Sequence, residues 1–164
     1  MIEKFLIKHP FVIIVVVVVS LATILIVLFA NTGEKTPATS DQVSAELVEL
    51  GYEPVDMTDY YGQYFSGLKE AVSAQTPNIR FYFFELNNND NSWAVYSKWQ
   101  YQIYQTLGGV HNPRTEHYCN YASYYVYAND MYYKLVWVDN TAVFAYCDEN
   151  YKNDIFKILE AIGY

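Results

Sequence analysis

The stretch HYCNYASYYVYANDMYYKLVWVDNTAVFAYC, from His117 to Cys147, decides the fold. It is rich in Tyr and Val, which are good strand formers, and two polar pairs, Asn129-Asp130 and Asp139-Asn140, interrupt it. Such pairs tolerate the positive φ angles of tight hairpin turns. The pattern therefore predicts a three-stranded meander, with strands at about His117–Ala128, Met131–Val138 and Thr141–Cys147.

Neither face of this meander is polar, although a sheet with one solvated face alternates apolar and polar side chains. One face carries the branched aliphatic residues, which indicates that it packs on helices. The other is a candidate binding surface, because Tyr and Trp bury a large area and keep a polar group. Its residues are Tyr124, Tyr133, Trp137, Phe144 and Tyr146. The alternative is that Tyr serves only as a strand former and that helices cover both faces.

The residues around the meander complete one predicted α+β domain, residues 41–164. We expect helices at 41–50, 62–74, 92–107 and 151–162, with Gly or Pro close to the end of each. A further strand is expected at Ile79–Leu86 (IRFYFFEL). The predicted order of elements is ααβαβββα, and the predicted sheet is four-stranded and mostly antiparallel.

The N-terminal part predicts a membrane anchor. Sixteen of the twenty residues from Phe11 to Ala30 are Phe, Val, Ile or Leu, and none is charged. Twenty helical residues rise about 30 Å, which matches the hydrocarbon core of a bilayer. The alternative is a cleaved signal peptide, which has a shorter apolar region followed by small residues. The apolar run is longer here, and Leu28 is not small, so we expect an uncleaved transmembrane helix at 11–30.

The distribution of Lys residues predicts the orientation of this anchor. Lys4 and Lys8 precede it, whereas Lys35 alone follows it closely. Positive charge stays on the cytoplasmic side, so residues 1–10 are expected in the cytoplasm. Residues 31–40 (NTGEKTPATS) then form a flexible linker, and residues 41–164 form an extracellular domain of a single-pass cell-membrane protein.

The charge of the chain excludes one class of partner. The net charge is −8, and from Asp41 onward seven Lys and Arg face sixteen Asp and Glu, a balance of −9. Nucleic-acid binding needs a basic surface, so no nucleic-acid partner is expected.

A search for catalytic or metal-binding motifs assigns no catalytic residue, metal or cofactor. Glycine-rich phosphate loops, a G-x-S-x-G elbow and H-E-x-x-H are absent. His117 and Cys119 are two residues apart on one predicted strand, so they share a face, but zinc needs three or four ligands. The register of the meander places Cys119 and Cys147 more than about 25 Å apart. No disulfide is therefore predicted between them, because a bridge needs Cα atoms within about 7 Å.

Four structural motifs mark the predicted domain: Gly51-Tyr52, the strand FYFFEL, the turn Asp139-Asn140-Thr141 and the closing AIGY. These motifs resemble those of a group of small, membrane-anchored or lipid-anchored outer-surface proteins of Gram-positive, clostridia-like bacteria. The resemblance implies a similar outer domain and location, but it assigns no functional residues.

These observations predict a non-enzymatic, membrane-anchored extracytoplasmic module that binds a surface protein or a glycan. Two alternatives stay open. The first is a cell-surface hydrolase or thiol enzyme that uses His117 and Cys119. The second is an accessory subunit that docks onto a membrane complex.

Overall fold

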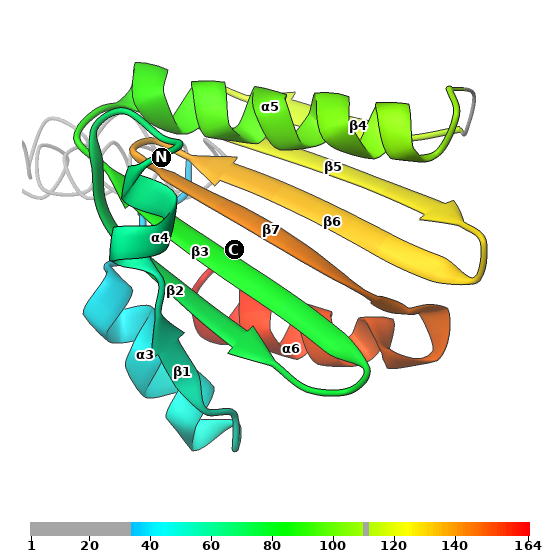
Figure 1. Ribbon diagram of the computed structural model, residues 1–164, viewed down its shortest axis with the longest axis horizontal. Helices are drawn as coiled ribbons and strands as arrows, with labels where there is room; N and C mark the ends of the chain where they lie inside the picture. Colours follow the sequence, from blue (N-terminus) through cyan, green and yellow to red (C-terminus); the bar gives the residue numbers. More distant parts are fainter. Residues whose placement is uncertain (1–33, 110–111) are drawn as a thin grey trace, which may run out of the picture. The chain divides into compact units, whose positions relative to one another are not determined.

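The computed structural model describes residues 34–109 and 112–164, and one compact unit spans Lys35–Tyr164 (Figure 1). Its seven strands form one antiparallel sheet in the order β1-β2-β3-β7-β6-β5-β4. The strands are β1 (Pro54–Asp56), β2 (Leu68–Gln75), β3 (Ile79–Leu86), β4 (Arg114–Tyr118), β5 (Tyr121–Ala128), β6 (Met131–Val138) and β7 (Thr141–Asp148). The helices are α3 (Ser40–Glu49), α4 (Thr58–Gly62), α5 (Asn89–Thr106), the 3-10 turn η1 (Glu149–Tyr151) and α6 (Lys152–Ala161).

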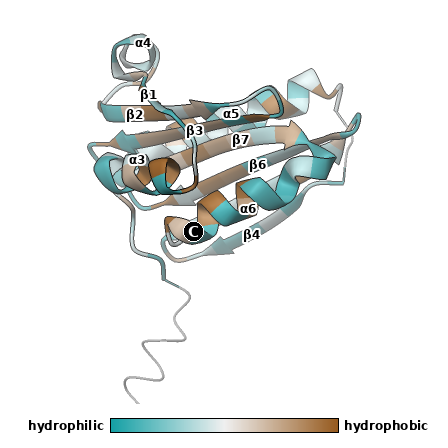
Figure 2. Cartoon of the chain, turned by 90° about the horizontal axis from the view of Figure 1, so that it is seen from below, coloured by the Kyte–Doolittle hydropathy of each residue, from teal (hydrophilic) through white to brown (hydrophobic). Residues whose placement is uncertain are grey.

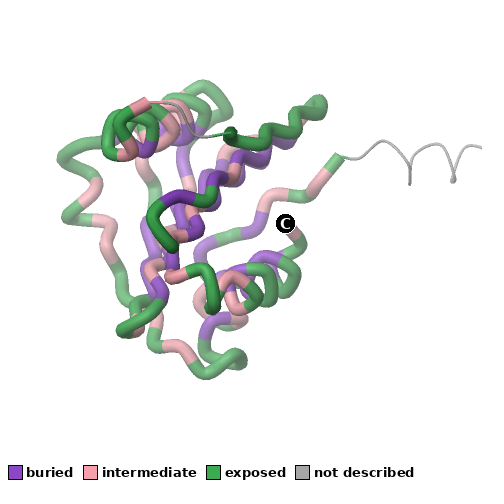
Figure 3. Tube along the Cα trace, turned by 90° about the vertical axis from the view of Figure 1, so that its right-hand side faces the viewer, coloured by how far each residue is buried: buried purple, intermediate pink, exposed green. Residues whose placement is uncertain are grey.

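Helices cover both faces of the sheet. Helices α3 and α6 lie on one face, α3 against β2 and β3 and α6 against β7, as the view from below also shows (Figure 2). Helix α5 crosses β3, β7 and β6 on the opposite face, and α4 contacts β2. The strands of the interior are accordingly the most buried part of the trace, while the outer sides of the helices are exposed (Figure 3).

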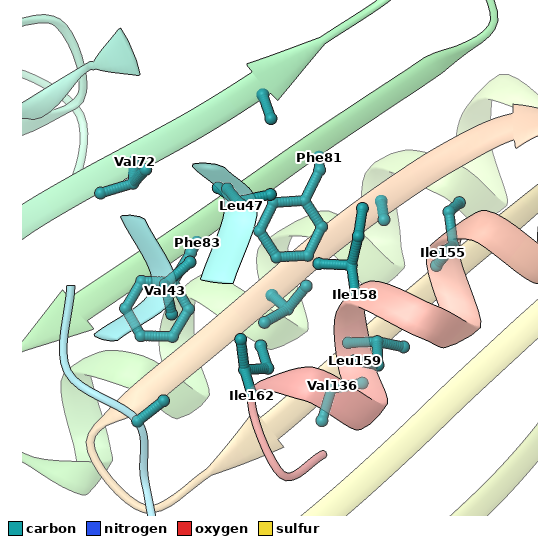
Figure 4. Close-up of a cluster of buried hydrophobic side chains, with 14 of the residues drawn as sticks. Val43, Leu47, Val72, Phe81, Phe83, Val136, Ile155, Ile158, Leu159 and Ile162 are labelled. Carbon is teal, nitrogen blue, oxygen red and sulfur yellow. The ribbon is translucent and has the colours of Figure 1, made fainter. Parts of the chain in front are cut away.

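The face under α3 and α6 carries the aliphatic core. Phe81 and Phe83 alternate with Tyr82 and Phe84 along β3, so the first pair points to this face and the second to the other. Helix α6 brings Ile155 and Ile158, which are fully buried, onto the sheet beside them (Figure 4). The residues of this core that the close-up labels are Val43, Leu47, Val72, Phe81, Phe83, Val136, Ile155, Ile158, Leu159 and Ile162.

The meander has the registers that its two polar turns predict. Tyr121 pairs with Val138 across the Asn129-Asp130 turn, and Tyr132 pairs with Cys147 across the Asp139-Asn140 turn. Asn129 and Asp130 have φ angles of 53° and 63°, as a tight turn of this kind requires.

The predicted four-stranded sheet is wrong, because the sheet has seven strands. Residues 62–74, predicted to be a helix, contain the end of α4 and most of β2. Strand β2 pairs with β3 from Leu68↔Leu86 to Gln75↔Arg80, which buries Ala71 on one face and Val72 and Ala74 on the other. Burial in the sheet overrides the helix preference of this Ala-containing segment.

The other two strands that the sequence did not predict, β1 and β4, lie at the two edges of the sheet. Residues 114–118, predicted to be partly loop, form β4, and the turn at Cys119-Asn120 separates β4 from β5. Every residue of β4 is exposed, so its sequence shows no alternation that would reveal a strand. Strand β1 has only three residues, too few for a recognisable pattern.

The start of the domain lies earlier than the predicted boundary at Asp41. The backbone of Lys35 exchanges hydrogen bonds with the Asn120 side chain, at 3.1 and 2.7 Å. The Ala38 amide donates to the Tyr164 hydroxyl at 2.8 Å. Thr39 and Gln42 then form a reciprocal capping box at the start of α3. Residues 35–39 therefore pack on the domain.

A transmembrane helix is not part of the fold that the structure describes. Within residues 34–109 and 112–164, no helix combines the length and the apolar character needed to span a bilayer. The segment predicted to do so, Phe11–Ala30, lies outside the described residues.

Candidate functional site: an aromatic groove beside α5

A groove of about 330 Å³ lies between the C-terminal half of α5 and the sheet. Its walls are predominantly aromatic, and polar side chains from α5 stand at its rim. The lining residues are Tyr82 of β3, Phe144 and Tyr146 of β7, Tyr133 of β6, and Trp99, Gln102, Ile103 and Thr106 of α5. Its volume is at the lower end of the range for small-molecule sites.

Strand pairing brings the sheet residues of the groove together. Tyr82 is the cross-strand partner of Phe144, and Tyr146 is the partner of Tyr133. Phe144 and Tyr146 are two residues apart on β7, so they share a face. On α5, Trp99, Gln102, Ile103 and Thr106 follow the three- and four-residue spacing of one helix face. The groove forms where this helix face lies over the two cross-strand pairs, Tyr82–Phe144 and Tyr133–Tyr146.

The rings of the groove form two adjoining stacks. Trp99 and Phe144 have ring centroids 4.3 Å apart and planes 22° apart. Tyr82 lies nearly parallel to both, at 5.9 Å from Phe144 and 6.5 Å from Trp99. Tyr133 and Tyr146 make the second stack at 5.9 Å, and Phe144 and Tyr146 join the two at 5.4 Å. Such contacts hold the rings in fixed relative positions.

The hydroxyls of Tyr82 and Tyr133 in the groove remain protonated at neutral pH. Burial raises the pKa of Tyr82, and the nearby Tyr146 raises it further, while the positive charge of Arg80 opposes the change. Burial also raises the pKa of Tyr133, with a smaller contribution from Tyr146. These hydroxyls therefore act as neutral hydrogen-bond donors and acceptors.

The structure divides the five residues of the predicted aromatic surface. Tyr133, Phe144 and Tyr146 meet in the groove, where Tyr133 and Tyr146 are half-buried and Phe144 is buried. Tyr124 and Trp137 are buried on the same sheet face and do not line the groove. Helix α5 covers this face, so the exposed part of the surface is the groove alone.

Two groove residues that the sequence did not single out are Tyr82 and Trp99. Both were assigned to the correct elements, a strand and a helix, but neither was connected to the surface of the meander. Strand β3, which precedes α5 in the sequence, pairs with β7, the last strand of the meander. This pairing places Tyr82 on the same sheet face as the aromatic residues of the meander. Nothing in the local pattern of either strand encodes that partner.

His117 and Cys119 do not form a catalytic pair in the structure. The ring of His117 lies parallel to that of Trp137, with centroids 6.4 Å apart, and meets Trp93 edge-on at 5.7 Å. Cys119 belongs to the turn after β4 and is exposed, while Cys147 is buried, and both thiols are free. Across residues 34–109 and 112–164, no three His, Cys, Asp or Glu side chains are grouped to hold a metal ion.

Comparison with known proteins informs the fold only. No protein-family model matches the chain, and no curated protein matches it. A similar solved structure is that of a GTP-binding regulator from Thermotoga maritima, with a TM-score of 0.50 and 10% sequence identity. The match covers 76% of this chain and 87% of the other. At this identity the likeness concerns the arrangement of elements.

Proposed function

We propose that this protein is a non-enzymatic binding module, held at the outer face of a cell membrane through its apolar segment 11–30, and that it binds a glycan in the groove beside α5. The observation that carries the proposal is the groove itself. It offers half-buried Tyr133, Tyr146, Tyr82 and Trp99 side by side in one concave space.

The chemistry of the lining favours a sugar. A pyranose ring has an apolar C–H face, which packs on an aromatic ring, and hydroxyls around its edge, which need hydrogen-bond partners. The groove supplies both kinds of contact, because Gln102 and Thr106 stand beside the rings and the hydroxyls of Tyr82 and Tyr133 are neutral.

The sequence supports the location. The apolar run from Phe11 to Ala30 is long enough to be retained in a bilayer, and Lys4 and Lys8 favour a cytoplasmic N-terminus. The resemblance to outer-surface proteins of clostridia-like bacteria agrees with this placement. Residues 35–39 pack on the domain, so the folded part of the chain begins close after the apolar segment in the sequence.

The competing functions have less support. A thiol enzyme would need Cys119 beside a base, and His117 packs instead against Trp93 and Trp137. The similar structure is named a GTP-binding regulator. Nucleotide binding is not proposed for this chain, because its sequence lacks a glycine-rich phosphate loop.

Titration of the full chain in mild detergent with a neutral tetrasaccharide of N-acetylglucosamine tests the proposal, using Trp fluorescence and calorimetry. We expect saturable binding that Tyr146→Ala weakens by about tenfold, because the substitution removes one ring from the groove. The matched control is Tyr127→Ala, which removes a tyrosine that is 41% exposed and lies outside the groove. Equal affinities of the two variants, with both folded by circular dichroism, would contradict the proposal.

A further inference from the structure

A second hollow adjoins the groove. It has a volume of about 300 Å³ and is lined by Pro77, Asn78, Arg80, Met131, Tyr146 and Asp148. Tyr146 lines both spaces, so this residue separates the aromatic groove from the polar hollow. Arg80 is the cross-strand partner of Tyr146, and both side chains line this hollow.

Arg80 is held in place but is not neutralised. Its Nη1 group donates to the carbonyl oxygen of Ile79 at 3.0 Å and also to that of Thr76, at the turn between β2 and β3. An arginine has five N–H donors, and these two bonds use the two on Nη1. The Nε and Nη2 donors have no partner among the described residues, and no described carboxylate lies within 4.0 Å of the guanidinium.

Arg80 is one of four Lys and Arg side chains from Asp41 onward that form no ion pair with a described carboxylate, and it is the one that lines this hollow; the others are Lys98, Arg114 and Lys134. Asp148 lines the same hollow, but its carboxylate caps η1, accepting hydrogen bonds from the backbone and side chain of Asn150 at 3.0 and 2.8 Å. Asp148 keeps its negative charge, so an additional negative charge in the hollow is disfavoured beside Asp148 and favoured on the side of Arg80.

We infer that the glycan is acidic, and that Arg80 binds the carboxylate of a sugar acid while the sugar ring packs in the groove beside Tyr146. The inference rests on the proposed function and extends it to the ligand class. The fork of free N–H groups on Nε and Nη2 matches the two oxygens of a carboxylate, a geometry that a lysine does not offer. The two carbonyl contacts keep this fork oriented before the ligand arrives, which reduces the entropy lost on binding.

The test compares a tetrasaccharide of galacturonic acid with its uncharged methyl ester, on the full chain in mild detergent. We expect the acid to bind at least tenfold more tightly than the ester at low salt, and the advantage to shrink as salt rises. Arg80→Gln should remove this advantage, so that the variant binds the acid and the ester with similar affinity. The matched control is Arg114→Gln, which changes the same charge on the exposed edge strand β4.

The outcomes separate the inference from the function on which it rests. If the acid and the ester bind the wild-type chain equally, or if Arg80→Gln and Arg114→Gln weaken the acid equally, the role of Arg80 is wrong while glycan binding stands. If neither ligand nor the neutral tetrasaccharide binds the wild-type chain, both the inference and the proposed function are wrong. Circular dichroism of Arg80→Gln and Arg114→Gln checks that both variants are folded.

Discussion

At the scale of single residues, Lys134 is an ionisable group inside the sheet. It is 9% exposed, and its Nζ atom donates to the Ser123 hydroxyl at 2.5 Å. The nearest ring, that of Tyr125, has its centroid 5.5 Å away, and no described carboxylate lies within ion-pair distance. Burial lowers the pKa of Lys134 to about 8, with Glu116 opposing the shift and Lys35 adding to it. Folding therefore favours the neutral amine.

This burial predicts a pH-dependent stability. Below pH 8 the amine is charged in both states, and the folded state bears the full cost of its burial. Between pH 8 and the ordinary value of 10.5, the unfolded state binds more protons, so the stability of the wild type rises with pH, by up to about 3 kcal/mol. Lys134→Met has no amine at this position, so it lacks this pH-dependent contribution to stability. Urea unfolding at pH 7 and pH 10 should show the wild type gaining stability relative to the variant.

Lys98→Met is the control for this experiment, because Lys98 is exposed on α5 beside the ring of Phe65. The difference in unfolding free energy between Lys98→Met and the wild type should stay nearly constant over the same pH range. A constant difference for Lys134→Met as well would show that the amine is not buried in the folded state.

At the scale of elements, the position of α5 decides which part of the aromatic sheet face stays accessible. Ser92, in the first turn of α5, is fully buried and accepts a hydrogen bond from Trp137 Nε1 at 2.9 Å. Its hydroxyl also contacts the carbonyl oxygen of Asp139 in the turn between β6 and β7. This single side chain connects the helix to the meander and satisfies the indole that α5 covers.

Replacement of this side chain should destabilise the fold. In Ser92→Ala the buried indole N–H of Trp137 loses its partner, which costs about 1–3 kcal/mol. Ser97→Ala, a half-buried position on the same helix, should cost much less. Urea unfolding followed by Trp fluorescence measures both. If Ser92→Ala and Ser97→Ala unfold at the same urea concentration, the bond between Ser92 and Trp137 does not hold α5 in place.

The elements also show how far sequence reasoning reaches. Ile79–Leu86 and Met131–Val138 have the predicted bounds, because each combines strong strand formers with turn residues at its ends. Residues 62–74 were predicted as helix, but most of β2 lies there, because its strand conformation depends on pairing with β3. In the candidate site, Tyr133, Phe144 and Tyr146 followed from the meander, whereas Tyr82 required the pairing of β3 with β7 and Trp99 required the packing of α5 on the sheet.

At the scale of the whole domain, the two cysteines lie in contrasting environments. Cys119 is exposed in the turn after β4, and Cys147 is 1% exposed in the core beneath α6. Burial raises the pKa of the Cys147 thiol to about 11, with the charges of Asp148 and Asp154 adding to the effect. The thiolate is the reactive species, so the two residues should differ in reactivity.

Labelling with a chromogenic disulfide reagent at pH 8 should therefore detect one thiol in the native protein and two in guanidinium. The single native reaction should disappear in Cys119→Ser and persist in Cys147→Ala. No reactive thiol in the unfolded protein would reveal a disulfide and contradict both the prediction from the register and the structure. Two reactive thiols in the native protein would show that the core around Cys147 opens readily.

The sequence by itself determined the α+β class, the meander with its two turns and registers, and the helices α3, α5 and α6. These features depend on residues close to one another along the chain, through periodicity, capping and turn chemistry. Only the tertiary structure decided that β1, β2 and β4 extend the sheet to seven strands, and that α5 covers Trp137 but leaves the Tyr133–Tyr146 pair half-buried. Pairing and burial of this kind arise from partners distant in sequence, whose identity no local pattern carries.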